Sequence, residues 1–435
     1  MVEQNVCVLM KAFKIILTAM TLLAILFKLN NTASAFHSGG VGPCDACHAM
    51  HNASGPADTL LRASDPSSVC LHCHERAGDI GPTKYHVSTS PSDMPQGSPP
   101  RQLTPGGDFG WLRKTYTWNP DATQAPMISY GDRHGHNIVA NDYFYLPDMV
   151  NAVAPQGTYP AASLACISCH DPHGKYRRNA DGSITTSGAS VGGSGSYSTS
   201  NDPQVNSAVG VYRMLGGRNY QPKSVGGNFA FLNDSPAAVA PPEYNRSEAI
   251  SQTRVAYGSG MSEWCQNCHT TMHTIAGSGS TLKMHPVGGV AKLGSTYSGN
   301  YNTYIKTGDL SGTASTSFLS LVPFEEGTGN YTVLKMRAKS DDTYLMGPDP
   351  TNTQVMCLTC HRAHASGWDG ATRWNTRTDY IVFNGSYSQE GQIYQPYGQG
   401  RTEIEAQRAY YELAANRFAA NQETLCHKCH TGAIP

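Results

Sequence analysis

The chain has 435 residues, which is enough for two or three ordinary domains. Only 14% of the residues are charged, and 44 Gly and 26 Pro disfavour long helices and strands, because Gly costs backbone entropy and Pro lacks an N–H donor. The formal net charge of -1 excludes the basic footprint of a nucleic-acid-binding protein and a basic membrane patch. We expect a mostly irregular fold with a few short helices and little or no β-sheet.

The N-terminus has the pattern of an export signal. Lys11 and Lys14 precede an apolar run over Ile15–Phe27, and an Ala-Ser-Ala cleavage site ends at Ala35. The run is shorter than the roughly 20 residues that span a bilayer, which disfavours the alternative of an uncleaved membrane anchor. The pattern predicts that residues 1–35 are a signal peptide that is removed on export. Residues 36–435 would then form a single mature domain.

Twelve of the 13 cysteines form six C-x-x-C pairs, and a histidine directly follows each pair. The six motifs are Cys44/Cys47/His48, Cys70/Cys73/His74, Cys166/Cys169/His170, Cys265/Cys268/His269, Cys357/Cys360/His361 and Cys426/Cys429/His430. One helical turn places residues i, i+3 and i+4 on one face. Two thiols can therefore add to the haem vinyl groups while the histidine reaches the iron. The pattern predicts six covalently bound haem c groups with these histidines as proximal ligands.

Disulfides and zinc sites also use paired cysteines. Neither requires a histidine after every pair, so haem attachment is the preferred interpretation. No pair is followed by Lys, so the sequence offers no Lys-ligated catalytic haem. We also find no nucleophile–base pair, carboxylate pair or phosphate-binding loop above chance. These observations favour an electron-transfer protein over an enzyme.

Six irons need six further ligands if each is held by two histidines, and the remaining histidines exceed that number. Eight of them are candidate distal ligands: His37, His51, His86, His136, His173, His273, His285 and His364. Three of the eight follow a proximal ligand by three residues, and His273 follows by four. A histidine so placed cannot reach the far face of its own haem, so it suits the iron of a neighbouring haem.

Three further histidines are interpreted as non-ligands. His72 and His427 lie between the two cysteines of their own motifs, from where they cannot reach the opposite haem face, and we expect them to be exposed. His134 and His136 are two residues apart, so an extended chain points them in opposite directions. At most one of these two should face a given iron, and we favour His136.

The clearest predicted helix is one longer C-terminal helix over Thr402–Leu425. Thr402 stands at its start, and Glu403 and Glu405 lie in its first turn. This helix would deliver Cys426 to the last haem. Elsewhere the apolar runs are short and scattered, and no conventional core is visible. We expect the haems to supply the buried apolar area and to organise the fold, so the chain should depend on haem to fold.

Several long stretches resemble a known family. They are Phe36 to Gly40, Leu103 to Trp111, Cys169 to Arg178, Thr253 to Cys265, and Pro323 to Gly327. In these stretches the chain resembles the hexahaem outer-membrane cytochromes of metal-reducing bacteria that polymerise into extracellular filaments, the cytochrome S type. The resemblance covers most of the mature chain. It departs from the family at His72, His134 and His427 and in the signal peptide.

The resemblance implies a chain of haems in close contact, two histidines on every iron and very little regular secondary structure. It also implies that the histidine three residues after the first proximal ligand reaches the fifth haem of the next subunit. That histidine is His51 here, and the fifth haem is the one bound by His361. The implied partners are therefore other copies of this chain in a head-to-tail filament.

Three functions compete. A polymerising conduit would deliver electrons at the cell surface or outside the cell to metal oxides, other cells or other multihaem cytochromes. A monomeric carrier in the periplasm or at the cell surface would need the same motifs, so the resemblance alone separates the two. A multihaem nitrite or hydroxylamine reductase would need an open iron position, which the surplus of histidines disfavours.

Overall fold

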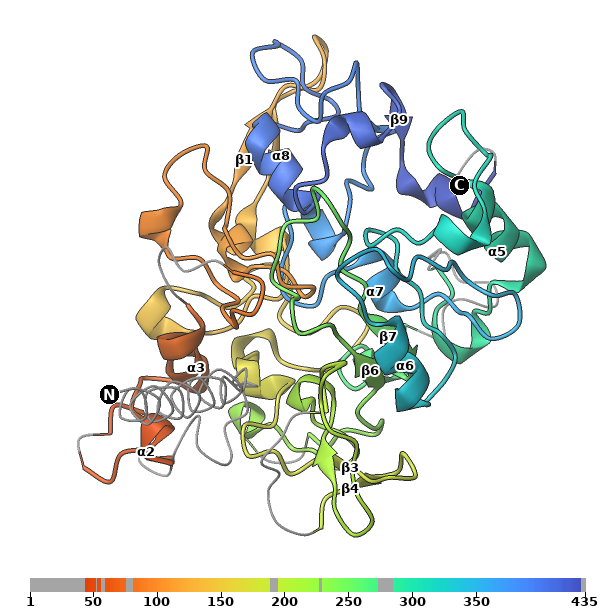
Figure 1. Ribbon diagram of the computed structural model, residues 1–435. Helices are drawn as coiled ribbons and strands as arrows, with labels where there is room; N and C mark the ends of the chain where they lie inside the picture. Colours follow the sequence, from red (N-terminus) through yellow and green to blue (C-terminus); the bar gives the residue numbers. More distant parts are fainter. Residues whose placement is uncertain are drawn as a thin grey trace, which may run out of the picture. The chain divides into compact units, whose positions relative to one another are not determined.

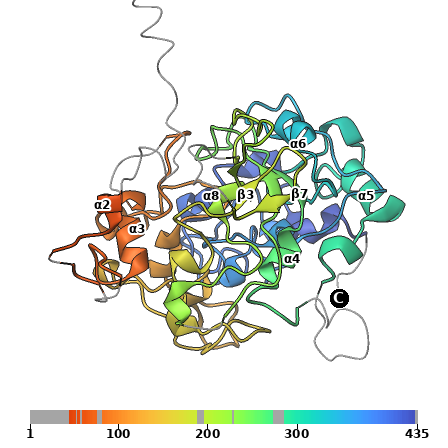
Figure 2. The same ribbon diagram turned by 90° about the horizontal axis from the view of Figure 1, so that it is seen from below.

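The computed structural model describes residues 44–51, 53–55, 59–75, 81–187, 195–226, 229–272 and 285–431. The predicted signal peptide and the candidate ligands His37 and His273 lie outside these residues. The described elements are short and are joined by long irregular segments (Figures 1 and 2). The predicted fold class, mostly irregular with few short helices and little β-sheet, is confirmed.

The longest described helix has ten residues. The described α-helices are α2 (Cys44–Cys47), α3 (Pro66–His74), α4 (Met261–Cys265), α5 (Gly294–Thr303), α6 (Tyr331–Arg337), α7 (Cys357–Cys360) and α8 (Glu403–Ala409). The 3₁₀ helices are η2 (Pro91–Asp93), η3 (Phe109–Arg113), η4 (Gly131–Arg133), η5 (Asn141–Tyr143), η6 (Ala161–Ser163), η7 (Cys166–Ser168), η8 (Tyr212–Met214), η9 (Lys223–Val225), η10 (Gly288–Val290), η11 (Ala314–Thr316), η12 (Asp369–Ala371), η13 (Ala415–Arg417) and η14 (Leu425–Lys428). Among the described residues, no helix combines the length and apolar character needed to cross a bilayer.

The described strands form four small antiparallel sheets. The strands are β1 (Tyr116–Trp118), β2 (Met127–Ser129), β3 (Arg177–Arg178), β4 (Ile184–Thr185), β5 (Val209–Gly210), β6 (Ala237–Val239), β7 (Ala256–Ser259), β8 (Tyr380–Val382) and β9 (Gln422–Glu423). The pairs are β1 with β2, β6 with β7 and β8 with β9, and the remaining sheet has the order β4-β3-β5. Helix α6 packs on β6 and β7 through Leu334 and Val239 (Figure 1).

Helix α3 shows how the sequence builds a short haem-binding element. Its N-cap is Asp65, whose carboxylate accepts the backbone N–H of Ser68 at 2.8 Å, and Pro66 occupies the first helical position, where no N–H is needed. The other carboxylate oxygen of Asp65 accepts the N–H of Asn141 at 2.7 Å and ties the helix to a distant segment. These bonds therefore fix the position of the helix that carries Cys70 and Cys73.

The prediction of one longer C-terminal helix over Thr402–Leu425 is wrong in length. The helix does begin after Thr402, where the Thr402 side chain and Glu405 form a capping box. It ends at Ala409, because Tyr411 and Glu412 adopt left-handed backbone angles with φ of 58° and 69°. Cys426 is instead carried by the separate turn η14.

The expectation that no conventional core exists is also wrong. Four clusters of buried apolar side chains occur in the described residues, and the largest is rich in aromatic rings, including Trp111, Trp368, Trp374 and Tyr410. The attachment cysteines line the edges of these clusters. The largest cluster packs against Cys360, Cys426 and Cys429, and two others pack against Cys166 and Cys169. The polypeptide thus supplies its own core beside the attachment sites.

Candidate haem sites

Each C-x-x-C-H motif lies on, or begins in, a short helical turn. Five of these elements are α2, η7, α7, η14 and the C-terminal end of α3, and the fourth motif begins at Cys265, the last residue of α4, and continues in the turn that follows. In five motifs the proximal histidine N–H donates to the carbonyl of the first cysteine at 2.9 to 3.0 Å. This bond holds residues i, i+3 and i+4 on one face. The twelve thiols form no disulfide, and no cluster of three or more His, Cys, Asp and Glu suitable for a metal ion occurs in the described ranges.

The proximal rings are oriented by backbone carbonyls. In five of them Nδ1 lies within hydrogen-bond distance of a carbonyl oxygen: His48 with Thr59 (2.8 Å), His74 with Tyr85 (2.8 Å), His170 with Arg213 (2.7 Å), His269 with Pro155 (2.7 Å) and His361 with Gly370 (2.7 Å). A carbonyl oxygen can only accept, so Nδ1 carries the proton in each ring. This fixes the tautomer in which Nε2 is the metal-binding nitrogen.

Four proximal imidazoles face a second imidazole from a different part of the chain. The distances between ring centroids are 6.4 Å for His48 and His173, 6.4 Å for His170 and His364, 6.2 Å for His269 and His136, and 5.9 Å for His430 and His285. An imidazole nitrogen binds a first-row metal at about 2 Å, so two rings on opposite sides of one iron would have centroids about 6 Å apart. All four pairs fit this spacing.

The paired rings also have the exposure that haem binding requires. Every one of the eight rings is half-buried or exposed, although several lie between segments far apart in sequence. The Nδ1 of His136 donates to the Ala363 carbonyl at 2.7 Å, and that of His285 donates to the Pro286 carbonyl at 2.8 Å. Both distal rings therefore also keep Nε2 for a metal. The residues present fit six haem groups.

Attachment sites that follow one another in sequence are neighbours in space. We number the motifs and their haems 1 to 6 in chain order. The Cys70 and Cys166 thiols of motifs 2 and 3 hydrogen-bond, as do the Cys265 and Cys357 thiols of motifs 4 and 5. Ser67 and Ser262 reinforce these junctions by accepting the N–H groups of Cys166 (3.1 Å) and Cys357 (3.0 Å).

At the remaining junctions, cysteines of consecutive motifs are close enough to raise one another's pKa. Burial and then Cys73 raise the pKa of Cys47, which joins motifs 1 and 2. Burial and then Cys169 raise the pKa of Cys268, which joins motifs 3 and 4. Burial and then Cys426 raise the pKa of Cys360 to about 12, which joins motifs 5 and 6. Each attachment site thus lies beside the next one in sequence.

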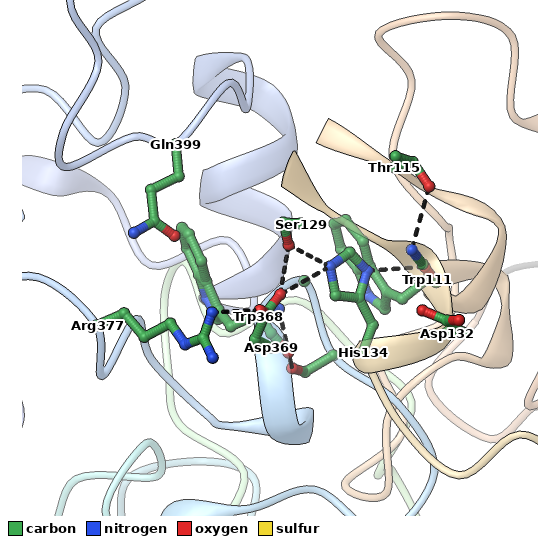
Figure 3. A network of polar contacts seen from close by, with 12 residues as sticks. Trp111, Thr115, Ser129, Asp132, His134, Trp368, Asp369, Arg377 and Gln399 are labelled. Carbon is green, nitrogen blue, oxygen red and sulfur yellow. Dashed lines mark hydrogen bonds and ion pairs between the residues drawn. The ribbon is translucent and has the colours of Figure 1, made fainter. Parts of the chain in front are cut away.

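The two other candidate ligands among the described residues, His51 and His86, are not part of these pairs. His51 is exposed, and His86 is buried with 1% of its surface exposed. His72 is exposed, as predicted, whereas His427 is half-buried and forms an ion pair with Glu423. The His134 ring is enclosed by protein (Figure 3), whereas His136 is exposed and faces His269, which agrees with the expectation that at most one of the two faces a given iron.

Sequence reasoning missed one buried arginine beside an attachment site, Arg362. Arg362, directly after His361, is 3% exposed, and its Nε has no hydrogen-bond partner. Its guanidinium lies 3.4 Å from the Tyr411 ring centroid, and burial lowers its pKa to about 10. A buried guanidinium with an unused donor fits a haem propionate. The position next to the proximal ligand was the only sequence signal available.

Comparison with known proteins gives one consistent result. No protein-family model matches the chain. The C-type cytochrome OmcS of Geobacter sulfurreducens is 53% identical over 415 residues, which are 92% of this chain and 94% of that protein. A cryo-EM structure of the OmcS nanowires from Geobacter sulfurreducens has a TM-score of 0.83 and 51% identity, and covers 91% of this chain and 99% of that chain. The outer membrane cytochrome S filament from the same organism has a TM-score of 0.81 and 53% identity with the same coverage.

Proposed function

This chain belongs to the family of the c-type cytochrome OmcS, and from that premise we propose that it conducts electrons along six haem c groups in an extracellular filament of its own copies. The observation that carries the proposal is that the six attachment sites lie beside one another in chain order, and that four of their proximal imidazoles each face a second imidazole. Each bound haem would supply an iron that accepts and releases one electron. The cysteines attach the groups, and the histidines hold both axial positions.

The imidazole pairs support an assignment of four distal ligands. His173 would complete haem 1 opposite His48, and His364 would complete haem 3 opposite His170. His136 would complete haem 4 and His285 haem 6. With two histidines on each iron no coordination position is open for a substrate, so we infer that the protein is an electron carrier and not a reductase. Two nitrogen ligands also favour lower potentials than Met/His ligation.

The order of these ligands supports a ligand that crosses between subunits. His173 follows motif 3 and faces motif 1, and His364 follows motif 5 and faces motif 3. In both cases a His three residues after a proximal ligand serves the haem two places earlier. Two places before motif 1 in a head-to-tail series is motif 5 of the neighbouring subunit. His51, which follows motif 1, would therefore bind the haem held by His361 of the next copy.

The even-numbered haems support a second regularity. The ligand of haem 4, His136, lies between motifs 2 and 3, and the ligand of haem 6, His285, lies between motifs 4 and 5. The same order places the ligand of haem 2 before motif 1, where His37 stands. The deep burial of His86 agrees with this choice. His86 and His273 would then be the two spare candidates.

The location and partners follow from the same proposal. The N-terminal 35 residues would direct export and be removed, leaving residues 36–435 as the subunit. A coordinate bond across each contact would fix the orientation of a non-closing head-to-tail assembly. The filament would pass electrons to extracellular acceptors such as metal oxides or other cells, and would receive them from other multihaem cytochromes.

The test is the His51→Ala variant of the full haem-loaded protein. We expect the unaltered protein to form filaments, to be entirely low-spin and to bind no carbon monoxide when reduced. His51→Ala should remain soluble with six haems, should fail to polymerise, and should have one partly high-spin haem per chain. His72→Ala removes an exposed histidine and should behave like the unaltered protein.

Ordinary all-low-spin filaments of His51→Ala would show that His51 does not form the junction. A soluble six-haem monomer from the unaltered chain under filament-forming conditions would support the monomeric carrier instead.

A further inference from the structure

A buried polar cluster surrounds His134, which is 0% exposed (Figure 3). The ring Nδ1 donates to the Trp111 carbonyl at 3.0 Å, and Nε2 lies 2.8 Å from the Ser129 hydroxyl and 3.4 Å from the Arg401 guanidinium. Both ring nitrogens are therefore engaged by protein, so His134 has no nitrogen left for an iron.

The cluster continues from Ser129 to a buried carboxylate. The Ser129 hydroxyl donates to one oxygen of Asp369, and Arg377 donates to the other at 2.7 Å. Arg401, which is 1% exposed, donates to Ser129 at 3.0 Å and to the Gly367 carbonyl at 2.6 Å. We call Ser129, His134, Asp369, Arg377 and Arg401 the His134 cluster. It joins β2, η4 and η12 with the segment before α8.

The backbone of the cluster bonds to two ligand-bearing segments. The Ser366 N–H donates to the His134 carbonyl at 2.9 Å, and the His136 N–H donates to the His364 carbonyl at 2.9 Å. The His136 ring donates to Ala363 in the same segment at 2.7 Å. The segment 134–136 thus lies against 363–366, and the position of the His136 ring opposite His269 depends on that of the His364 ring opposite His170.

The carboxylate side of the cluster reaches a third ligand. Asp369 begins the turn η12, and the carbonyl of the next residue, Gly370, accepts Nδ1–H of His361 at 2.7 Å. Holding the Asp369 carboxylate between Ser129 and Arg377 fixes this turn. The hydrogen bond that orients His361 is therefore anchored to the same cluster.

We infer that the His134 cluster is a positioning device that sets the ligand geometry of haems 3, 4 and 5 together. The inference rests on the proposed assignment of His364, His136 and His361 to these haems. It gives His134, rejected as a ligand, a role in the middle of the electron path. Hydrogen bonds behind a metal-binding imidazole fix its orientation and basicity, so loss of the cluster should change the ligand field of these irons.

The experiment compares the low-spin electron paramagnetic resonance signals and the reduction potentials of haem-loaded variants. His134→Ala and Asp369→Asn should each shift the signals and potentials of three haems and leave the other three unchanged. His134→Gln retains one amide donor and one acceptor and should restore the signals in part. The matched control is Glu326→Gln, which alters another buried carboxylate that accepts from arginine side chains, here those of Arg254 and Arg337. It should leave all six signals in place.

Two results would overturn the inference: six unchanged signals in His134→Ala, or an equal change in all six, which would indicate general destabilisation. The variant His136→Ala separates this failure from failure of the ligand assignment. It should convert one haem to high spin whatever the role of His134. If it leaves all six haems low-spin, the assignment of haem 4 is wrong, and the inference fails with its premise.

Discussion

Single residues beside the haem path carry unusual charge states, and Glu325 is the clearest example. Its side chain is 0% exposed, and one carboxylate oxygen has no hydrogen-bond partner. The other oxygen accepts the N–H of Met261 at the start of α4 at 3.5 Å. Burial, and then the nearby charge of Glu263, raise the pKa of Glu325 from 4.5 to about 7. Between pH 4.5 and about 7 the folded protein therefore keeps a proton on Glu325 that the unfolded chain releases.

This shift predicts a specific pH dependence of stability. The contribution of Glu325 to the free energy of unfolding is fully present below pH 4.5 and is lost as the pH rises to about 7. Between these values only the unfolded chain is stabilised by ionisation of this carboxyl. The difference in pKa corresponds to a loss of about 3 kcal/mol. Glu325→Gln should remove this pH-dependent loss of stability. The unfolding temperature of the variant should therefore rise relative to that of the unaltered protein between pH 5 and pH 8. Parallel stability curves for the two proteins would contradict this prediction.

At the scale of elements, close backbone contacts position the ligand segments. Gly107 has φ of +93°, and its carbonyl lies 3.3 Å from Nδ1 of His364. A Cβ at this position would lie 1.7 Å from the carbonyl oxygen of Ala365. The contact holds the loop before η3 against the segment that carries His364, so glycine is required both by the backbone angle and by the space.

Gly107→Ala should therefore move His364 away from His170. We expect an unstable protein in which one haem loses its low-spin signal. Gly97→Ala is the matched control, since its φ is +77° but a Cβ there would meet nothing within 4 Å. The control should cost only about 1 kcal/mol of backbone strain and keep six low-spin haems. Similar spectra for both variants would show that the contact with Ala365 does not position the ligand.

Local signals in the sequence predicted where elements begin better than where they end. The capping residues correctly placed the start of α8 after Thr402. The apolar periodicity that followed was misleading, because Tyr410 and Leu413 join the aromatic core from an irregular segment. Tyr411 turns instead toward the Thr104 carbonyl, which its hydroxyl binds. Tertiary packing, which a local pattern does not contain, ended the helix.

At the scale of the whole molecule, the motifs predicted the number of haems, but not which distal histidine faces which proximal histidine. The partner of His48 lies beyond motif 3, and that of His269 lies before it. Such pairings depend on how distant loops pack and leave no local signal. The extended chain assumed for His134 and His136 is not found, because His134 caps η4 with helical backbone angles, φ of −85° and ψ of −3°. The buried core was missed because its aromatic residues are scattered singly along the chain.

The attachment series also predicts that folding depends on haem. Motif 3 lies between motifs 2 and 4, and Cys166 contacts Cys70 across the first of these junctions. Replacing Cys166 and Cys169 with Ser should remove haem 3 from the middle of the series and prevent accumulation of the protein in cells. Ser187→Ala, at an exposed position after motif 3, is the control and should leave accumulation unchanged. A stable five-haem product with an unchanged circular dichroism spectrum would contradict the prediction.

We propose above all that one unbroken series of haems, each held by two histidines, runs through the chain and continues into the next copy. A cryo-electron microscopy map of the assembled protein, at a resolution that shows imidazole rings, tests this most directly. We predict six haems per subunit in motif order, with His51 of one subunit bound to the iron opposite His361 of its neighbour. A map in which His51 binds no iron, or in which the ligand of that haem comes from its own chain, would contradict the account.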